Sequence, residues 1–150
     1  MTQEKTKVKA TFPSLEWFEA LSEIINADDG YRHIGTCDAT VGIKIPEQDK
    51  FYLLTFEAFE VAGVKEVSAT EAEDTDFWLE VSYERWKDMI QNIKENGKAD
   101  LTHTLNTIDL EEPEGFARSH DGYRRDAFYR FNQSFQHFFD SSAKIDTKFA

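Results

Sequence analysis

The sequence predicts an α+β fold in which helices pack on one face of a mainly antiparallel sheet of about five strands. Apolar residues recur at helical spacing near both ends of the chain and alternate with polar residues in its middle, where short turns separate the alternating segments. Strands joined by short hairpins, with helices before and after them, are typical of this class. The chain has 150 residues, which suits one domain with its own core.

The first helix is expected to begin directly after Pro13, with Ser14 as its N-cap. Residues 1–10 are expected to be a flexible lead-in, so the single folded domain covers 11–150. The apolar residues at helical spacing are Leu15, Phe18, Leu21 and Ile25. Turn-forming residues at 26–30 then end the helix.

Strands are expected between residues 31 and 81. Apolar residues alternate with small or polar ones over 41–45, and 46–50 is a turn of hairpin length. The segment 51–61 is the longest apolar stretch and is rich in aromatic residues. A further alternation over 77–81 predicts another strand.

A second helix is expected after Ser82, which is a good N-cap, and before Gly97, which would end it. Its apolar face consists of Trp86, Met89, Ile90 and Ile93. The segment 99–110 fits either a short helix or a turn that leads into a strand, because its leucines have helical spacing while its threonines favour a strand.

The last expected element is a long helix over 123–142 that closes an apolar interior. Its phenylalanines lie on one face and are Phe128, Phe131, Phe135, Phe138 and Phe139. An aromatic stripe of this kind forms core more often than a ligand site. Facing the second helix and the segment 51–61, it also provides the bulky apolar walls that a cavity for a hydrophobic ligand requires.

The charge of the chain argues against nucleic acid as a partner. Acidic residues number 29 and basic residues 17, so the formal net charge is −12, whereas nucleic-acid binding depends on Lys and Arg. No apolar run approaches the length of a membrane-spanning helix, and the first residues lack the apolar core of a signal peptide. The single cysteine, Cys37, cannot form an internal disulfide and is expected to be a small buried residue in a cytoplasmic protein.

Motifs for metal, nucleotide or cofactor binding are not found in the sequence. The four histidines and one cysteine lack the short spacings of a zinc site, and the glycines form no phosphate-binding loop. We therefore expect no metal and no cofactor.

Two groups of polar residues are weaker candidates for a function. His103 could act as a general base with Asp100 or Asp109, although a polar surface face is the favoured explanation of these residues. Arg124 and Arg125, at the start of the last helix, could bind an anionic head group, or they could pair with neighbouring acids.

Two stretches of the chain resemble the sterol carrier protein type 2-like group. They are Phe12 to Phe18 (FPSLEWF), which leads to Ile25 and Asn26, and Asp76 to Trp86 (DFWLEVSYERW), in which a strand passes directly into a helix. The resemblance implies a five-stranded sheet with helices over one face and a tunnel for sterols, fatty acyl chains or similar lipids. It implies no catalytic residue.

The function expected from these observations is non-catalytic binding or carrying of a hydrophobic small molecule in an apolar tunnel. The expected ligand-binding residues are Phe18, Leu21, Phe56, Trp86, Met89, Ile90, Phe128, Phe131, Phe135 and Phe138, with Arg124 and Arg125 as candidates for the head group. One alternative is a small cofactor-free enzyme of the isomerase or hydratase type that uses His103. Another is an accessory subunit of a larger enzyme, and a homodimer also stays open. The helix-grip fold, which also ends in a long helix, is the structural alternative.

Overall fold

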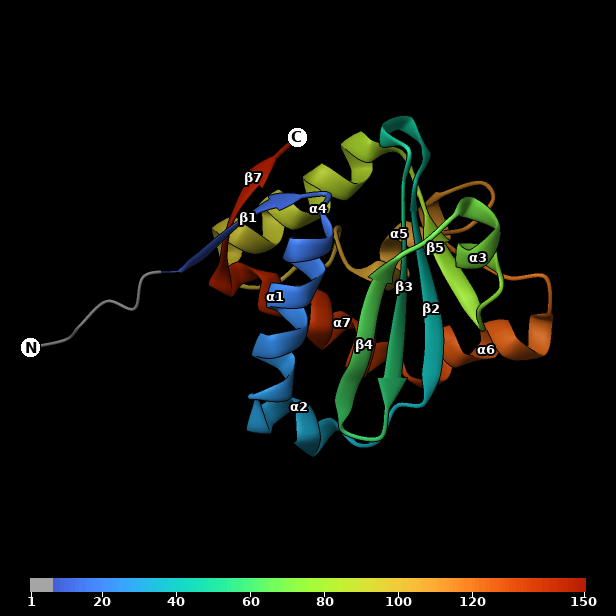
Figure 1. The fold of residues 1–150 in the computed structure, drawn as a ribbon, viewed down its shortest axis with the longest axis horizontal. Coiled ribbons are helices and arrows are strands. Elements are labelled where there is room, and N and C mark those ends of the chain that lie inside the picture. Colours follow the sequence, from blue (N-terminus) through green and yellow to red (C-terminus); the bar gives the residue numbers. More distant parts are fainter. Residues whose placement is uncertain (1–6) are drawn as a thin grey trace, which may run out of the picture.

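A computed structural model describes residues 7–150, which form a five-stranded sheet with helices packed against it (Figure 1). The strands are β2 (Ala39–Ile45), β3 (Lys50–Glu57), β4 (Glu60–Glu66), β5 (Phe77–Glu80) and β6 (Ala117–Arg118). Their order across the sheet is β4-β3-β2-β5-β6. The β2–β3, β3–β4 and β5–β6 pairs are antiparallel and the β2–β5 pair is parallel. The α+β class with a mainly antiparallel sheet is therefore confirmed.

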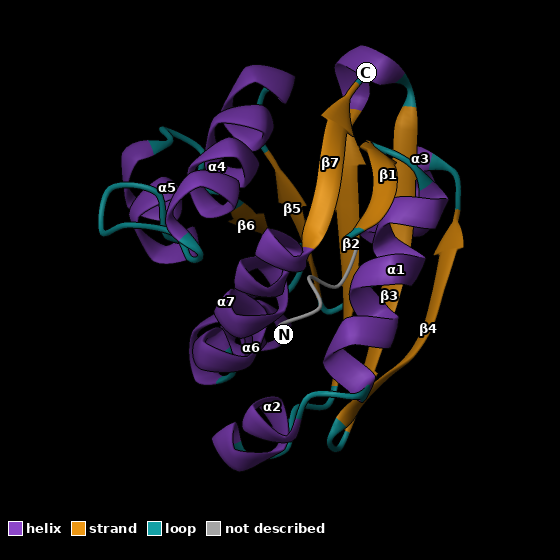
Figure 2. Cartoon of the chain, turned by 90° about the vertical axis from the view of Figure 1, so that its left-hand side faces the viewer, coloured by secondary structure: helices purple, strands orange, loops and turns teal. Residues whose placement is uncertain are grey.

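The larger helices lie on one face of this sheet, as Figure 2 shows for α1, α4 and α7. The helices of the chain are α1 (Leu15–Asn26), α2 (Asp29–Ile34), α3 (Ala69–Glu73), α4 (Tyr83–Asn96), α5 (Leu105–Glu111), α6 (Gly122–Arg130) and α7 (Asn132–Asp140), with short 3-10 turns at Pro46–Gln48 and Ser141–Lys144. The predicted N-caps are both present: the Ser14 side chain accepts a hydrogen bond from the Trp17 amide at 3.1 Å, and Ser82 accepts one from the Arg85 amide at 3.2 Å.

The two faces of β2 differ because its residues alternate between them. Val41, Ile43 and Ile45 are buried on the side of the large helices. On the opposite side, α3 approaches so closely that a Cβ atom at Gly42 would lie 2.0 Å from the Ala72 carbonyl oxygen. A glycine at this position therefore lets α3 cover part of the outer face, which the sequence did not predict.

A second, two-stranded sheet joins the two ends of the described chain. β1 (Val8–Phe12) pairs in parallel with β7 (Ile145–Phe149), and the Trp17 indole nitrogen donates a hydrogen bond to Thr147 at 3.0 Å beside it. The expected flexible lead-in thus becomes a strand from Val8 onwards, while residues 1–6 of that lead-in lie outside the described residues.

The expected long helix over 123–142 is divided into α6 and α7. Phe131 stands between them with φ −108° and ψ 23°, outside helical geometry. Phe128 of α6 contacts Phe77 of β5, and α7 contacts both β5, through Phe135, and β3, through Phe138. The chain then continues into β7 instead of ending in a helix. The phenylalanine stripe is therefore divided between two shorter helices.

The ambiguous segment 99–110 forms a turn followed by the short helix α5, which is the first of its two predicted forms. The strand that follows in the chain is β6, which has two residues. Within residues 7–150, no helix combines the length and the apolar character that crossing a membrane requires.

Candidate functional site

The predicted ligand-binding residues come together in the interior between the sheet and the large helices. Nine of the ten are buried, and they come from α1, β3, α4, α6 and α7. The exception is Phe131, which is half-buried beside the Arg130 guanidinium and lines a surface pocket of about 410 Å³. Because most of the phenylalanine stripe is covered within one chain, it offers little aromatic surface to a larger enzyme, and the accessory-subunit alternative loses its main support.

Aromatic rings fill this interior in two connected groups. In the first, Phe56 of β3 lies 5.2 Å from Phe135 and 5.3 Å from Phe138 of α7, measured between ring centroids. Both pairs meet edge to face, which is a favourable geometry for aromatic rings. The helix α7 therefore contacts the sheet through its rings.

The second group lies around α1 and α4. Here Phe12 lies 5.9 Å from Trp86, and Phe18 lies 4.8 Å from Tyr52. A contact of 5.9 Å between Trp86 and Phe139 joins this group to the first. The interior is thus one continuous aromatic layer, for which we use the name aromatic interior.

Two tyrosine hydroxyls are enclosed in the aromatic interior without a hydrogen bond. Tyr31 of α2 and Tyr52 of β3 are both 0% exposed, and neither hydroxyl has a partner among residues 7–150. Burial raises the pKa of both phenols, and the nearby carboxylates of Glu66 and Glu16 raise the pKa of Tyr52 further. Both groups therefore stay neutral. A buried hydroxyl that lacks a partner costs about 1–3 kcal/mol of stability.

Sequence reasoning missed both tyrosines as site residues. For Tyr52 a signal existed, because it alternates with Leu54 and Phe56 along β3 and so had to face the same side. For Tyr31 no such pattern exists, since α2 has only six residues and Tyr31 is its buried one. Cys37, near Tyr31, is buried as expected, and burial raises the pKa of its thiol to about 12.

The two arginine candidates for the head group are engaged by other groups. Arg124 Nε lies 3.0 Å from the Asp76 carboxylate. Arg125 Nε donates to the Ala117 carbonyl oxygen at 2.7 Å, and its Nη2 lies 3.6 Å from the Asp109 carboxylate. Both arginines therefore pair with acids, but these are Asp76 and Asp109, which are distant in the chain, and not the neighbouring acids that the sequence suggested.

The structure joins His103 to Asp100 but not to Asp109. His103 Nδ1 lies 2.7 Å from Asp100 Oδ1, and its Nε2 lies 3.0 Å from Asp88 Oδ2. Asp100 first, and then Asp88, raise the pKa of the imidazole, so the ring holds its proton more firmly and is less available to accept one from a substrate. Asp109 is instead buried, where it accepts hydrogen bonds from the Phe116 and Ala117 amides.

Four surface pockets formed by residues 7–150 are lined by side chains other than His103. A general base must reach a bound substrate, and none of these four pockets would place a substrate beside His103. The geometry therefore gives the acid–base alternative no support.

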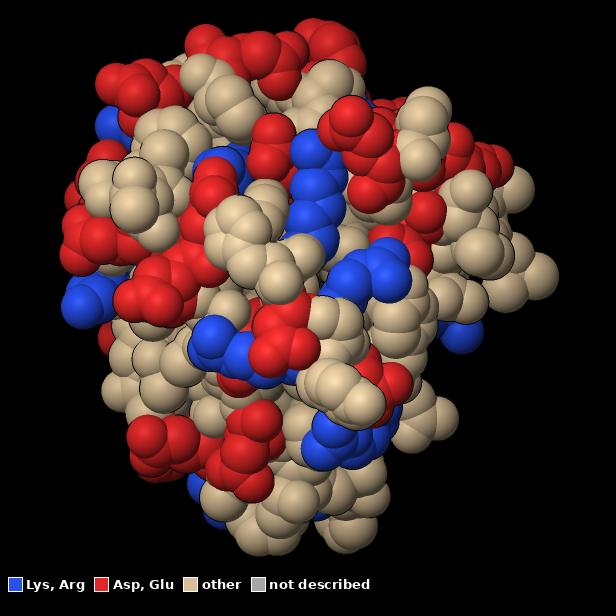
Figure 3. Space-filling view, turned by 90° about the vertical axis from the view of Figure 1, so that its right-hand side faces the viewer, with Lys and Arg blue, Asp and Glu red and all other residues tan. Residues whose placement is uncertain are grey.

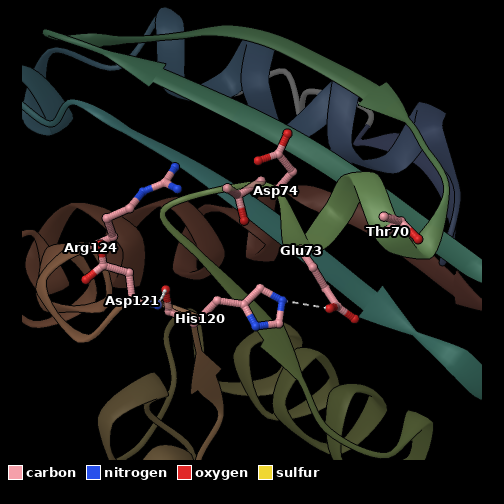
Figure 4. A pocket seen from close by; sticks show the side chains of 8 residues that line it. Thr70, Glu73, Asp74, His120, Asp121 and Arg124 are labelled. Atoms are coloured by element: carbon pink, nitrogen blue, oxygen red, sulfur yellow. Dashed lines mark hydrogen bonds and ion pairs between the residues drawn. The ribbon is translucent and has the colours of Figure 1, made fainter.

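A polar pocket of about 300 Å³ lies on the outer face of the sheet, where basic side chains are interspersed among acidic ones (Figure 3 and Figure 4). Figure 4 shows the His120 ring pointing to Glu73, and their Nε2 and Oε1 atoms are 3.0 Å apart. Lys44 also pairs with Glu73, lies 3.7 Å from Glu80, and sits 5.3 Å from the centre of the Trp78 ring. The Lys44 ammonium is the main cause of the lowered pKa of Glu73.

Lys44 and His120 thus both contact the Glu73 carboxylate, and Arg124, which also lines the pocket, pairs with Asp76. Within residues 7–150, no group of three or more His, Cys, Asp or Glu side chains is arranged to hold a metal ion.

Comparisons with known proteins yield one similar structure. No protein-family model matches the chain, and a search of curated proteins returned no match. The solution structure of a conserved hypothetical protein from Thermus thermophilus, described as possibly a sterol carrier protein, is similar with a TM-score of 0.62 and 17% sequence identity. The similarity covers 95% of this chain and 97% of that one. At this identity it shows a shared fold.

Proposed function

We propose that this protein binds and carries a hydrophobic small molecule, such as a sterol, a fatty acyl compound or a similar lipid, within its aromatic interior. The observation that carries the proposal is the pair of buried hydroxyls of Tyr31 and Tyr52, which have no hydrogen-bond partner among residues 7–150. A polar group on an otherwise apolar molecule would supply the partner that one of these hydroxyls lacks. The shared fold with a protein described as possibly a sterol carrier supports the same conclusion.

The energetics favour a ligand of this kind. Each methylene group that leaves water for an apolar interior contributes about 0.8 kcal/mol. A hydrogen bond to a hydroxyl that is otherwise unsatisfied adds to this, because the cost of burying that hydroxyl has already been met in the free protein. The aromatic interior provides the apolar surroundings, and Met89 among its rings adds a flexible side chain that adapts to irregular shapes.

Binding requires the rings of the interior to move, and α7 is the wall best suited to this. Its contacts with β3 and β5 are between aromatic rings. Its side-chain hydrogen bonds run elsewhere: His137 to Asp28 beside α2, at 2.7 Å, and Gln136 to the Leu105 amide of α5, at 2.8 Å. A ligand between α7 and the sheet would therefore displace rings without breaking the hydrogen bonds of the sheet.

Tryptophan fluorescence tests the proposal, because the three tryptophans are divided between the two faces of the sheet. Trp17 and Trp86 are fully buried in the aromatic interior, and Trp78 lies on the outer face beside Lys44. The variant Trp78→Phe therefore leaves only the interior fluorophores. We expect a long-chain alcohol with a brominated chain to quench the fluorescence of Trp17 and Trp86, and the quenching should reach a plateau as the alcohol concentration rises. The same alcohol without bromine should leave this fluorescence unquenched.

The control is the protein with Trp78 retained, in which a fraction of the emission should resist the brominated chain. If quenching of the Trp78→Phe variant rises linearly without saturation, or does not occur, no ligand enters the interior and the proposal is wrong.

A further inference from the structure

We infer that the aromatic interior selects lipids with an uncharged polar group, such as an alcohol, a ketone or an ester, and discriminates against lipids that end in a carboxylate. The inference rests on the proposed function and concerns which chemical group meets Tyr31 and Tyr52. It follows from the lack of a cation in the interior and from the carboxylates near Tyr52.

The aromatic interior, as far as residues 7–150 form it, contains no cation that could neutralise a buried anion. The one buried Lys or Arg side chain in that range is Lys44, at 8% exposed. Lys44 is on the outer face of the sheet with Gly42, where it lies over Trp78 and pairs with Glu73. Its charge therefore belongs to the outer face, and a carboxylate inside would have no countercharge.

The surroundings of Tyr52 are negative. Glu66 stands opposite Tyr52 in the β3–β4 pair, and both Glu66 and Glu16 of α1 raise the pKa of the phenol. The neighbouring cation, Lys50, lies 3.6 Å from Glu66 and is engaged with it at the surface. An anionic head group at Tyr52 would be repelled by these carboxylates, whereas an alcohol or a carbonyl group would not.

The surroundings of Tyr31 are neutral. The Cys37 thiol beside it stays protonated, because burial raises its pKa to about 12. The imidazole of His137, whose ring centroid lies 6.0 Å from that of Tyr31, is engaged by the Asp28 carboxylate, with Nε2 and Oδ2 2.7 Å apart. A carboxylate at Tyr31 would lose its hydration and gain only a bond to a neutral phenol, which does not compensate for burying a charge.

A neutral phenol suits an uncharged partner, because its hydroxyl can act both as a hydrogen-bond donor and as an acceptor. Each hydroxyl can donate one hydrogen bond to a carbonyl or hydroxyl oxygen, and it can accept one from a hydroxyl group. The formal net charge of −12 adds a long-range repulsion of anionic lipids as they approach the protein. The geometry and the charges thus point to the same class of head group.

The test compares three molecules with the same chain: dodecanol, methyl dodecanoate and dodecanoate. Each displaces the brominated alcohol from the Trp78→Phe variant, at about pH 8, where a carboxylic acid is ionised. We expect the alcohol and the ester to bind about tenfold more tightly than the carboxylate, or more. Equal affinity for dodecanol and dodecanoate would overturn the inference.

Substitutions test whether the tyrosines make the contact. We expect Tyr31→Phe, Tyr52→Phe or both to weaken dodecanol binding about fivefold, as for one lost hydrogen bond, and to leave dodecanoate unchanged. Tyr123→Phe is the matched control, since Tyr123 is 91% exposed, and it should bind like the parent protein. Unchanged dodecanol affinity in both interior variants would also overturn the inference. Failure of the brominated alcohol to bind at all is a separate result, which would refute the proposed function itself.

Discussion

Replacing Tyr52 with phenylalanine should stabilise the free protein and weaken its ligand complex. The substitution removes a hydroxyl that is fully buried and lacks a partner among residues 7–150, and it keeps the ring that lies 4.8 Å from Phe18. Removing this unsatisfied group should leave the free energy of unfolding unchanged or raise it by about 1 kcal/mol. An increase of that size corresponds to about 2–4 °C in Tm for a domain of this length. Urea unfolding followed by tryptophan fluorescence measures the change.

Tyr83 provides the matched comparison. Tyr83 is also a buried residue, at 9% exposed, but its hydroxyl donates a hydrogen bond to the Ala150 carbonyl oxygen at 2.7 Å. Tyr83→Phe should therefore lower the free energy of unfolding by about 1 kcal/mol, opposite in sign to Tyr52→Phe. If Tyr52→Phe destabilises the protein as much as Tyr83→Phe does, the Tyr52 hydroxyl has a partner and the reasoning from an unsatisfied group is refuted.

Three further predictions concern the fold itself. Phe135→Ala, which empties the contact between α7 and the sheet, should cost about 3–5 kcal/mol of unfolding free energy in urea, against about 1 kcal/mol for the half-buried Phe131→Ala; equal costs would contradict the packing described. Gly42→Ala should cost about 1–3 kcal/mol or more, because its Cβ would lie 2.0 Å from the Ala72 carbonyl oxygen, and a variant as stable as the parent in thermal unfolding would show that α3 does not pack there. The pKa of His103 is raised in the folded state, so its ion pairs stabilise the protein below the ordinary histidine pKa of about 6.5, and this stabilisation is lost as pH rises through the raised value. His103→Gln should accordingly lower the urea midpoint more at about pH 6 than at about pH 9, and a loss that does not depend on pH would contradict the ion pairs.

The helices α1 and α4 could be predicted from the sequence because local signals agree there. In α1 the N-cap serine stands directly before apolar residues at helical spacing, and α4 repeats this arrangement after Ser82 and ends at Gly97. The inner face of β2 was predictable for a similar reason, because its apolar residues alternate strictly. Such signals lie within a few residues of one another.

The features that the sequence did not reveal depend on partners that are distant in the chain. β1 forms only because β7 lies beside it, and Val8 and Ile145 are separated by most of the chain. The break at Phe131 leaves the apolar spacing of the stripe unchanged, so the spacing could not indicate it. The same limit applies to Arg124 of α6, whose partner Asp76 lies directly before β5 and far from it in the sequence.

For the candidate site, the apolar walls could be predicted and the polar groups could not. Hydrophobic pattern placed Phe56, Trp86 and Phe135 inside, since burial follows from periodicity. Whether a buried hydroxyl has a partner depends on every element packed around it, and Tyr31 and Tyr52 lie on elements whose local sequence gives no sign of this. The chemical character of the site therefore emerges only from the three-dimensional structure.

Native mass spectrometry of the purified protein is the most direct test of the central claim. If the aromatic interior carries a ligand, the spectrum of the protein should contain a species heavier by the mass of one uncharged lipid, and this species should be diminished in a Tyr31→Phe, Tyr52→Phe double variant. A spectrum that contains only the bare chain, both after purification and after incubation with a long-chain alcohol, would contradict the account.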